Sequence, residues 1–462
     1  MPLPSLVPAA PLPAWPSPEA ACAAPPRAAT GFGLFLLVNA ALFLRPAEIV
    51  PGLVGLEIYL FLIVACLLLA FPAVFEQLTV RSLDRNPLTV CVLGLWIAVI
   101  LSHLARFHFG GAAASGYEFF KIIVYYLLFV GLVTTPDRLI RFLFWLAIFA
   151  SALALIAILE YHDWIQLPTL KTLRAVEHDQ GSGRDIVVRR LQATGPFHDP
   201  NDFCVLLVVA ILLSLHGLTE LRGGQARWLW LGPLAILLYA FSLTQSRGGF
   251  LALLGGLFAF LFTRFGWRTT LGIAALLLPL LFMTLTGRQT DISAATGTGQ
   301  ERIQIWSDGL LLLRDAPLFG VGMNEFEKFV GHVAHNSYLQ GFAELGLIGG
   351  ALFLGAVFLA VTNVRRTGTA GREIVDPELR RLHPYLTGAV TGYAVGMFSL
   401  TLNYIVPTYM ILGLAAVWNK AAVTRPTLPP AQFDLRLVRR FLALALFFLV
   451  GLTLFVRVFF KH

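Results

Sequence analysis

Apolar segments near the length of a membrane-spanning helix recur along almost the whole chain. An α-helix needs about 20 residues to cross a bilayer. About thirteen segments approach that length: 31–45, 53–75, 88–105, 117–133, 138–160, 199–217, 228–243, 247–264, 268–287, 338–363, 384–402, 404–420 and 440–457. Asn403 and Pro407 interrupt the run after Pro384, so this run can also be one broken helix. The sequence predicts an all-α polytopic membrane protein with about 12–13 transmembrane helices.

The composition favours a membrane protein over an ordinary soluble one. Of the 462 residues, 57% are apolar and 13% are charged, against about 25% charged in a typical globular domain. The mean hydropathy is +0.76. The net charge of +8 would suit a nucleic-acid binder, but the basic residues lie at the predicted helix ends, so we expect no nucleic-acid partner. The four cysteines, Cys22, Cys66, Cys91 and Cys204, lack the spacing of a metal site or a disulfide scaffold.

Basic residues are concentrated in the connections on one side of the predicted helices. Counted over short loops, this side carries Arg81, Arg85, Arg138, Arg141, Arg222, Arg227, Arg264, Arg268, Arg365, Arg366, Arg372, Arg380, Arg381, Lys420, Arg425, Arg436, Arg439 and Arg440. The short loops of the other side contain only Arg45, Arg106 and Arg247. The Arg-rich side is therefore predicted to be cytoplasmic, which places two long loops, 161–198 and 288–337, outside the cytoplasm.

The two ends of the chain differ from the membrane domain between them. Residues 1–30 are rich in Pro and Ala and contain no apolar stretch long enough for a signal-peptide core. They predict a disordered tail. Residues 31–420 form the predicted membrane domain, and residues 421–462 a cytoplasmic linker followed by the last transmembrane helix.

Both long loops contain patterns that indicate structure. In the second, Ile303, Trp306, Leu310 and Leu313 recur at helical spacing, which predicts a helix that lies on the membrane or packs over the helix bundle. The first loop is basic, since it contains Lys171, Arg174, Arg184, Arg189 and Arg190. These charges can attract phosphorylated lipids, but they are interpreted as a solvated charge run.

The first loop ends in the sequence FHDPND and leads directly into a membrane helix. Asp199 or Asn201 can cap that helix. His198, Asp199 and Asp202 can also form an acid–base cluster, and the sequence leaves both interpretations open.

The segment HNSYLQGFAELGLIGG begins at His335, where the second loop re-enters the membrane. A histidine there, beside Asn336, can serve as a general base near neutral pH, although a lone interfacial histidine is more often structural. Glu344 falls inside the helix that follows. A carboxylate within a membrane costs about 2.5–3.5 kcal/mol on insertion scales, so Glu344 is expected to have a structural partner.

This segment resembles a motif of the O-antigen ligase and polymerase superfamily of bacterial envelope glycosyltransferases. The family pattern is His, then Asn, Ser or Gln, nine residues, Gly, two residues, and Gly, Thr or Tyr. This chain has His335, Asn336, nine residues, Gly346 and Gly349. An SRGG segment with Arg247 and a GQERIQIW segment with Arg302 also agree, and the resemblance extends over residues 31–420.

The resemblance implies a GT-C-like multi-pass glycosyltransferase of the bacterial inner membrane, which takes a glycan from undecaprenyl diphosphate on the periplasmic face. Arg247 and Arg302 are then expected to bind the diphosphate through their guanidinium groups. His335 is expected to accept the proton of the acceptor hydroxyl. Candidates for supporting roles are Asn336, His198, Asp199 and Asp202.

The expected reaction inverts the anomeric configuration and uses no cofactor and no metal ion, because the arginines neutralise the leaving diphosphate. Activity is expected to rise with pH through an apparent pKa near the ordinary histidine value of about 6.5. Structural interpretations remain: Arg247 can be an interfacial anchor, and Arg302 a solvated charge paired with Glu301 or Asp308.

Three reactions share this donor and differ in the acceptor. A ligase uses a lipopolysaccharide-core sugar, a polymerase of O-antigen or exopolysaccharide uses another lipid-linked repeat unit, and a protein O-oligosaccharyltransferase uses a protein hydroxyl. The sequence does not separate them. A transporter of lipid-linked sugars, which would share the membrane lipids as partners, is an alternative of another class. Such transporters usually have two related halves, and this chain shows no duplication.

Overall fold

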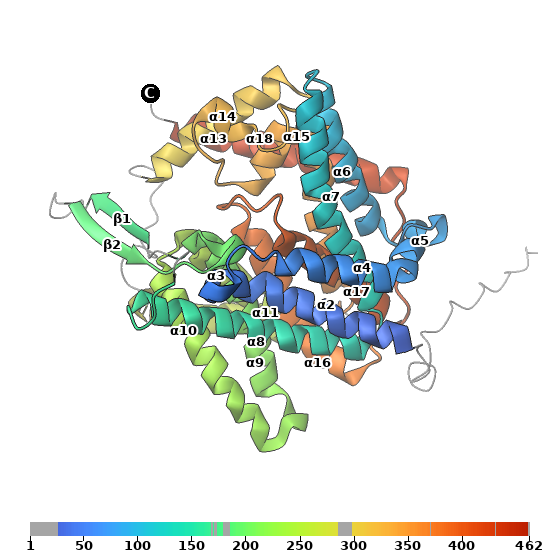
Figure 1. Cartoon of the computed structure of the whole chain (residues 1–462), viewed down its shortest axis with the longest axis vertical. Helices are drawn as coiled ribbons and strands as arrows, with labels where there is room; N and C mark the ends of the chain where they lie inside the picture. The colour runs from blue at the N-terminus through green and yellow to red at the C-terminus, as the bar shows by residue number, and fades with distance from the viewer. Residues whose placement is uncertain are drawn as a thin grey trace, which may run out of the picture.

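Helices account for most of the described chain. The computed structural model describes residues 26–167, 170, 173–178, 185–284, 298–369, 371–429 and 431–460. Each predicted apolar segment falls on a helix (Figure 1). Residues 1–25 of the predicted tail, Cys22 and parts of both long loops lie outside the described residues.

Ten helical stretches in the described part of the chain are long and apolar enough to cross a membrane. They fall on α2 (Pro26–Leu44), α4 (Ile58–Gln77), α6 (Pro87–Leu104), α7 (Phe109–Leu132), α8 (Pro136–Tyr161), α9 (Pro200–Thr219), α10 (Leu231–Thr244), α11 (Arg247–Phe265), α15 (Ser337–Arg366) and α18 (Leu435–Phe459). The protein is an all-α polytopic membrane protein.

Three predicted segments fall on helices outside these ten. The helix α12 (Trp267–Thr284) adjoins residues outside the described range. The helix α16 (Pro377–Gly396) begins with a charged turn, and α17 (Val406–Ala421) has only 16 residues. Residues 397–405 separate α16 from α17, so the run after Pro384 holds two helices rather than one broken helix.

Side-chain caps fix where the helices near one end of the bundle begin. The Ser246 hydroxyl accepts a hydrogen bond from the backbone N–H of Gly249 at the start of α11. The Asp199 carboxylate accepts one from Asn201 at the start of α9, where Pro200 occupies a first-turn position that needs no N–H donor. Of the two candidate caps, Asp199 is therefore the N-cap.

The predicted helix of the second long loop is present and packs over the bundle. It is α13 (Thr298–Asp315), and it is followed by the short α14 (Phe326–Val330). Ile303 of α13 packs with Leu339 of α15 and with Leu452 and Val456 of α18. Figure 1 shows α13, α14 and α18 grouped beside α15 at one end of the molecule.

The remaining elements are short. The strands β1 (Leu173–His178) and β2 (Asp185–Arg190) form an antiparallel hairpin at the left edge of Figure 1. Other short elements are α3 (Pro46–Ile49), α5 (Val80–Arg85), the strand pair β3 (Glu373–Ile374) and β4 (Thr424–Arg425), and 3-10 turns at Pro51–Leu53, Gly195–Phe197 and Leu221–Trp230.

The helix α15 is interrupted at Gly346, which has a φ of 69°. At this break the Leu347 N–H donates to the Pro317 carbonyl at 2.7 Å, and the Val321 N–H donates to the Ala343 carbonyl at 3.0 Å. A Cβ on Gly346 would lie 2.3 Å from the carbonyl carbon of Leu318. Glycine is therefore required here, and at the break the chain that follows α13 is hydrogen-bonded to both halves of α15.

Candidate active site

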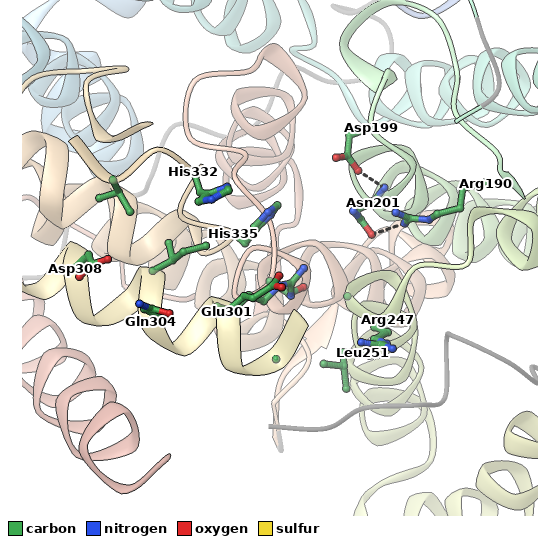
Figure 2. A pocket seen from close by; sticks show the side chains of 16 residues that line it. Arg190, Asp199, Asn201, Arg247, Leu251, Glu301, Gln304, Asp308, His332 and His335 are labelled. Atoms are coloured by element: carbon green, nitrogen blue, oxygen red, sulfur yellow. Dashed lines mark hydrogen bonds between the residues drawn. The ribbon is translucent and has the colours of Figure 1, made fainter. Parts of the chain in front are cut away.

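A cavity of about 670 Å³ lies between the starts of α9 and α11, the helix α13 and the residues before α15. Four residues predicted from the sequence line it: Arg247, Arg302, His335 and Asp199. Figure 2 shows His332 and His335 on one side and Asp199, Asn201 and Arg190 on the other, with Arg247 on α11. The fold thus gathers side chains that are far apart in the sequence.

Arg247 is the first residue of α11 and is half-buried. The two glycines after it allow α11 to start close to neighbouring side chains. A Cβ on Gly248 would lie 2.2 Å from the Ser399 hydroxyl, and one on Gly249 would lie 2.0 Å from the Cys204 sulfur. The SRGG segment therefore lets α11 begin against α9 and the connection between α16 and α17, which brings Arg247 to the cavity.

His335 is held by the connection between α16 and α17. Its backbone N–H donates to the Thr401 hydroxyl at 3.1 Å. The next hydroxyl, Ser337 Oγ, donates to the Leu400 carbonyl at 2.7 Å and accepts from the Leu402 N–H at 2.9 Å. His335 has a φ of 47°, a left-handed conformation that costs roughly 1–2 kcal/mol in a residue with a Cβ. The surrounding hydrogen bonds maintain this conformation.

Arg302 lies on α13, and a hydrogen bond joins this helix to the chain next to His335. Trp306 Nε1, one turn after Arg302, donates to the Ala334 carbonyl at 3.0 Å. The ring of Trp306 also lies 5.9 Å from that of Phe455 on α18. These contacts fix α13 between the last helix and the residues that precede α15.

Two residues of the motif have structural contacts. Asn336 is buried and caps α15, because its side-chain oxygen accepts from the N–H groups of Tyr338 and Leu339. Glu344 has the expected structural partners: its Oε1 accepts from the Phe326 N–H at 3.1 Å and from Gln340 Nε2 at 3.2 Å. Asn336 does not line the cavity, and Glu344 joins α14 to α15.

The prediction that Arg190 is a solvated charge is wrong. Its side chain is 5% exposed and lines the cavity. Its Nε donates to the Thr244 carbonyl at 3.0 Å, and its Nη2 donates to Asn201 Oδ1 at 2.8 Å. Asn201 Oδ1 also accepts from the Ser246 hydroxyl at 2.7 Å. The sequence DIVVRR does contain a signal for this burial. Its period-two pattern puts Val188 and Arg190 on the same face of a strand.

The other two candidates from FHDPND do not line the cavity. The side chain of His198 is 52% exposed, and its Nε2 lies 3.8 Å from Glu48 Oε2. Asp202 is a half-buried residue in the first turn of α9. Of the acid–base cluster considered from the sequence, only Asp199 reaches the cavity.

The cavity combines three guanidinium groups with carboxylates and two histidines, His332 and His335. Burial is the main cause that lowers the pKa of His335 to about 4, and the positive charge of Arg302 acts in the same direction. The negative charge of Asp199 raises that pKa, and His332 lowers it. At neutral pH the His335 imidazole is therefore uncharged and can accept a proton.

The cavity can bind an anion and move a proton. Arg190, Arg247 and Arg302 supply planar donor groups that suit phosphate oxygens. In the described part of the chain, the His, Cys, Asp and Glu side chains close enough to one another to hold a metal ion are His103, His108 and Glu325, which do not line this cavity.

A family model described as O-antigen ligase matches residues 232–354. The matched segment runs from α10 into α15 and contains Arg247, Arg302 and His335. It is shorter than the resemblance predicted over residues 31–420. No curated protein and no solved structure gives a significant match to the chain. The match over residues 232–354 supports the resemblance of this chain to the O-antigen ligase and polymerase superfamily.

Proposed function

We propose that the protein transfers a glycan from undecaprenyl diphosphate to a hydroxyl of an acceptor sugar, as an O-antigen ligase-like enzyme of cell-surface polysaccharide assembly. The observation that carries the proposal is the convergence of Arg247, Arg302 and His335 on one cavity. These residues come from two helices and a loop. The guanidinium groups suit the charge of the leaving diphosphate, and the imidazole suits the proton of the attacking hydroxyl.

In the proposed step, the acceptor oxygen attacks the anomeric carbon of the donor in line with the bond to the diphosphate. The new carbon–oxygen bond forms as the carbon–phosphate-oxygen bond breaks, and the electron pair leaves with the diphosphate. Arg247 and Arg302, with Arg190, neutralise the charge that develops there. His335 takes the acceptor proton and releases it to solvent. The product has inverted anomeric configuration, and no metal ion takes part.

The direction of the helices supports a periplasmic site. The cavity lies at the starts of α11 and α15, whereas Arg264 and the pair Arg365 and Arg366 lie at their other ends. Arginines in short connections favour the cytoplasmic side. The cavity would then face the periplasm of the inner membrane, where a lipid-linked glycan and an envelope acceptor can meet.

A polymerase of O-antigen or exopolysaccharide repeats, or a protein O-oligosaccharyltransferase, would use the same donor step. These alternatives differ only in the acceptor that reaches His335. A transporter of lipid-linked sugars is a different class; such transporters usually have two related halves, and this sequence shows no duplication.

The test is to reconstitute the purified protein with a lipid-linked glycan and candidate acceptors, and to measure donor affinity and product separately. His335→Ala should lower transfer by about 10²-fold or more, the usual effect of a lost general base, with donor affinity nearly unchanged. Arg247→Lys should lower transfer and weaken donor binding, because an ammonium cannot replace the planar guanidinium. Arg264→Lys, at the other end of α11, is the matched control.

A His335→Ala variant that transfers at the wild-type rate would refute the role of His335. An Arg247→Lys variant that behaves like Arg264→Lys would show that Arg247 is only an interfacial anchor. Donor binding without product for every acceptor class would favour the transporter.

A further inference from the structure

Outside the proposed active site, two histidines and a glutamate meet where three segments of the chain come together. His103 lies in the last turn of α6, His108 is the residue before α7, and Glu325 lies between α13 and α14. One ring nitrogen of each histidine and one carboxylate oxygen all lie within 4.8 Å of one another. We propose that this cluster binds a divalent transition-metal ion, preferably zinc.

The burial of His103 points to a missing partner. Its side chain is 1% exposed, and its Nε2 has no hydrogen-bond partner among the residues that the structure describes. A buried polar atom without a partner is unfavourable, because it has lost its hydrogen bonds to water. Its ring is enclosed by backbone, since a Cβ on Gly111 would lie 2.7 Å from His103 Nδ1 and one on Gly322 would lie 2.9 Å from it. The ring is therefore held in place, as a preorganised ligand must be.

The donor set selects the class of ion. Two imidazoles and one carboxylate suit zinc and its neighbours in the first transition row, whereas calcium and magnesium prefer oxygen ligands alone. Ligands at about 2.0–2.2 Å from a tetrahedral ion lie roughly 3.4 Å apart, so the cluster must contract slightly. His108 is exposed, and rotation of its side chain can supply that movement. Solvent would fill the fourth position.

The positive charge of Lys328 would repel a cation bound to this cluster. Its Nζ lies 2.8 Å from Glu325 Oε1, and the lysine side chain is 68% exposed. The second carboxylate oxygen, Oε2, is left for the metal ion, and the exposed lysine can also turn towards solvent. Lys328 weakens the site without blocking it.

The ion would join segments that are distant in the sequence. The turn between α6 and α7 already contacts the chain after α13, because Arg106 Nε donates to the Gly320 carbonyl at 3.4 Å. That same chain binds α15, since the Gly322 N–H donates to the Glu344 carbonyl at 2.9 Å. Bound zinc would therefore fasten the α13–α14 region to α6 and stabilise the folded protein.

The experiment uses the purified full chain in detergent, with any affinity tag removed because tag histidines bind zinc. Metal-stripped protein is mixed with Zn²⁺ and separated from free ion, and the bound zinc is measured by mass spectrometry. Wild type should retain about one zinc per chain and unfold at a higher temperature with zinc than without. His108→Ala and Glu325→Gln should bind zinc more than about tenfold more weakly and lose the zinc-dependent shift.

His162→Ala is the matched control, because His162 is also exposed and lies outside the cluster. It should retain zinc like wild type. His108→Ala changes an exposed side chain, so misfolding does not complicate its result. Wild type that retains no zinc, or cluster variants that retain as much as wild type, would overturn the site. Zinc that binds wild type without raising its unfolding temperature would overturn the fastening role. Glycan transfer does not enter this test, so its outcome is independent of the proposed function.

Discussion

At the residue scale, the environment of His335 changes what its chemistry should look like. An exposed histidine titrates near pH 6.5, and the sequence alone suggests a base with that pKa. Burial and Arg302 instead lower the pKa of His335 to about 4. The imidazole is then neutral throughout the physiological range, so it is always ready to accept a proton but is a weaker base.

The pH dependence of the reaction should report this shift. In the free enzyme, which kcat/KM reports, the acid limb should lie near pH 4, and activity should be flat between pH 6 and 8 as far as His335 is concerned. Bound diphosphate adds negative charge that stabilises the imidazolium, so the limb in kcat should lie at higher pH. Asp199→Asn removes a charge that raises the pKa of His335, and should move the kcat/KM limb to lower pH.

The measurement is transfer rate against pH for wild type and Asp199→Asn at several donor concentrations. An acid limb of kcat/KM near pH 6.5 in wild type would mean that the imidazole is solvated like a free histidine. A limb that moves to higher pH in Asp199→Asn would contradict the charge interaction between the two residues.

At the element scale, α18 supports the site although it lies beyond the segment that matches the ligase family. Leu452 and Val456 pack with Ile303 of α13 and Leu339 of α15. The ring of Phe448 lies 5.8 Å from that of Phe342 on α15. The last helix thus contacts both elements that carry or adjoin Arg302 and His335, without contributing a residue to the cavity wall.

Truncation of the packing on α18 should therefore reduce activity indirectly. Leu452 is 8% exposed, and Leu452→Ala should remove packing worth about 2 kcal/mol or more, by analogy with buried leucines elsewhere. It should lower both the unfolding temperature and the transfer rate. Leu446→Ala, on the same helix but 65% exposed, should change neither. Equal effects of the two variants, measured by thermal unfolding and transfer, would show that α18 does not support α13.

The residues at the cavity show which positions the sequence predicts and which it does not. Arg247, Arg302 and His335 were predicted because each lies in a short motif, and all three line the cavity. Arg190 was missed because a run of charges in a loop resembles a solvated surface, and only the pairing of its strand and the Asn201 contact bury it. His198 and Asp202 are candidates because they neighbour Asp199 in the sequence. Proximity in the sequence does not bring their side chains to the same cavity wall.

At the scale of the whole molecule, the sequence predicts which segments are helices better than it predicts which of those helices are long and apolar enough to span the membrane. Every predicted segment is a helix, because apolar runs of this length must satisfy their backbone hydrogen bonds internally. The charged first turn of α16 and the 16 residues of α17 leave these two short of a typical span. Contacts with neighbouring helices, rather than their own hydropathy, hold α16 and α17 in the bundle. Hydropathy alone could not reveal this.

The orientation of the molecule can be tested with single cysteines. Cys66, Cys91 and Cys204 are buried, so only Cys22 needs to be replaced to remove background labelling. Asp315→Cys, at the exposed end of α13, should react with an impermeant thiol reagent in intact spheroplasts. Arg366→Cys, at the far end of α15, should react only after permeabilisation. The reverse labelling would put the cavity in the cytoplasm and refute a periplasmic reaction.

The left-handed backbone of His335 sets stability and activity in competition at a single position. Glycine adopts this conformation without a steric penalty, so a redesign that rewards only folding would favour glycine there. A selection that rewards glycan transfer should always return histidine. Libraries randomised at this codon should therefore diverge between the two selections, and the divergence would measure how much folding stability the chain forgoes to keep its imidazole in place.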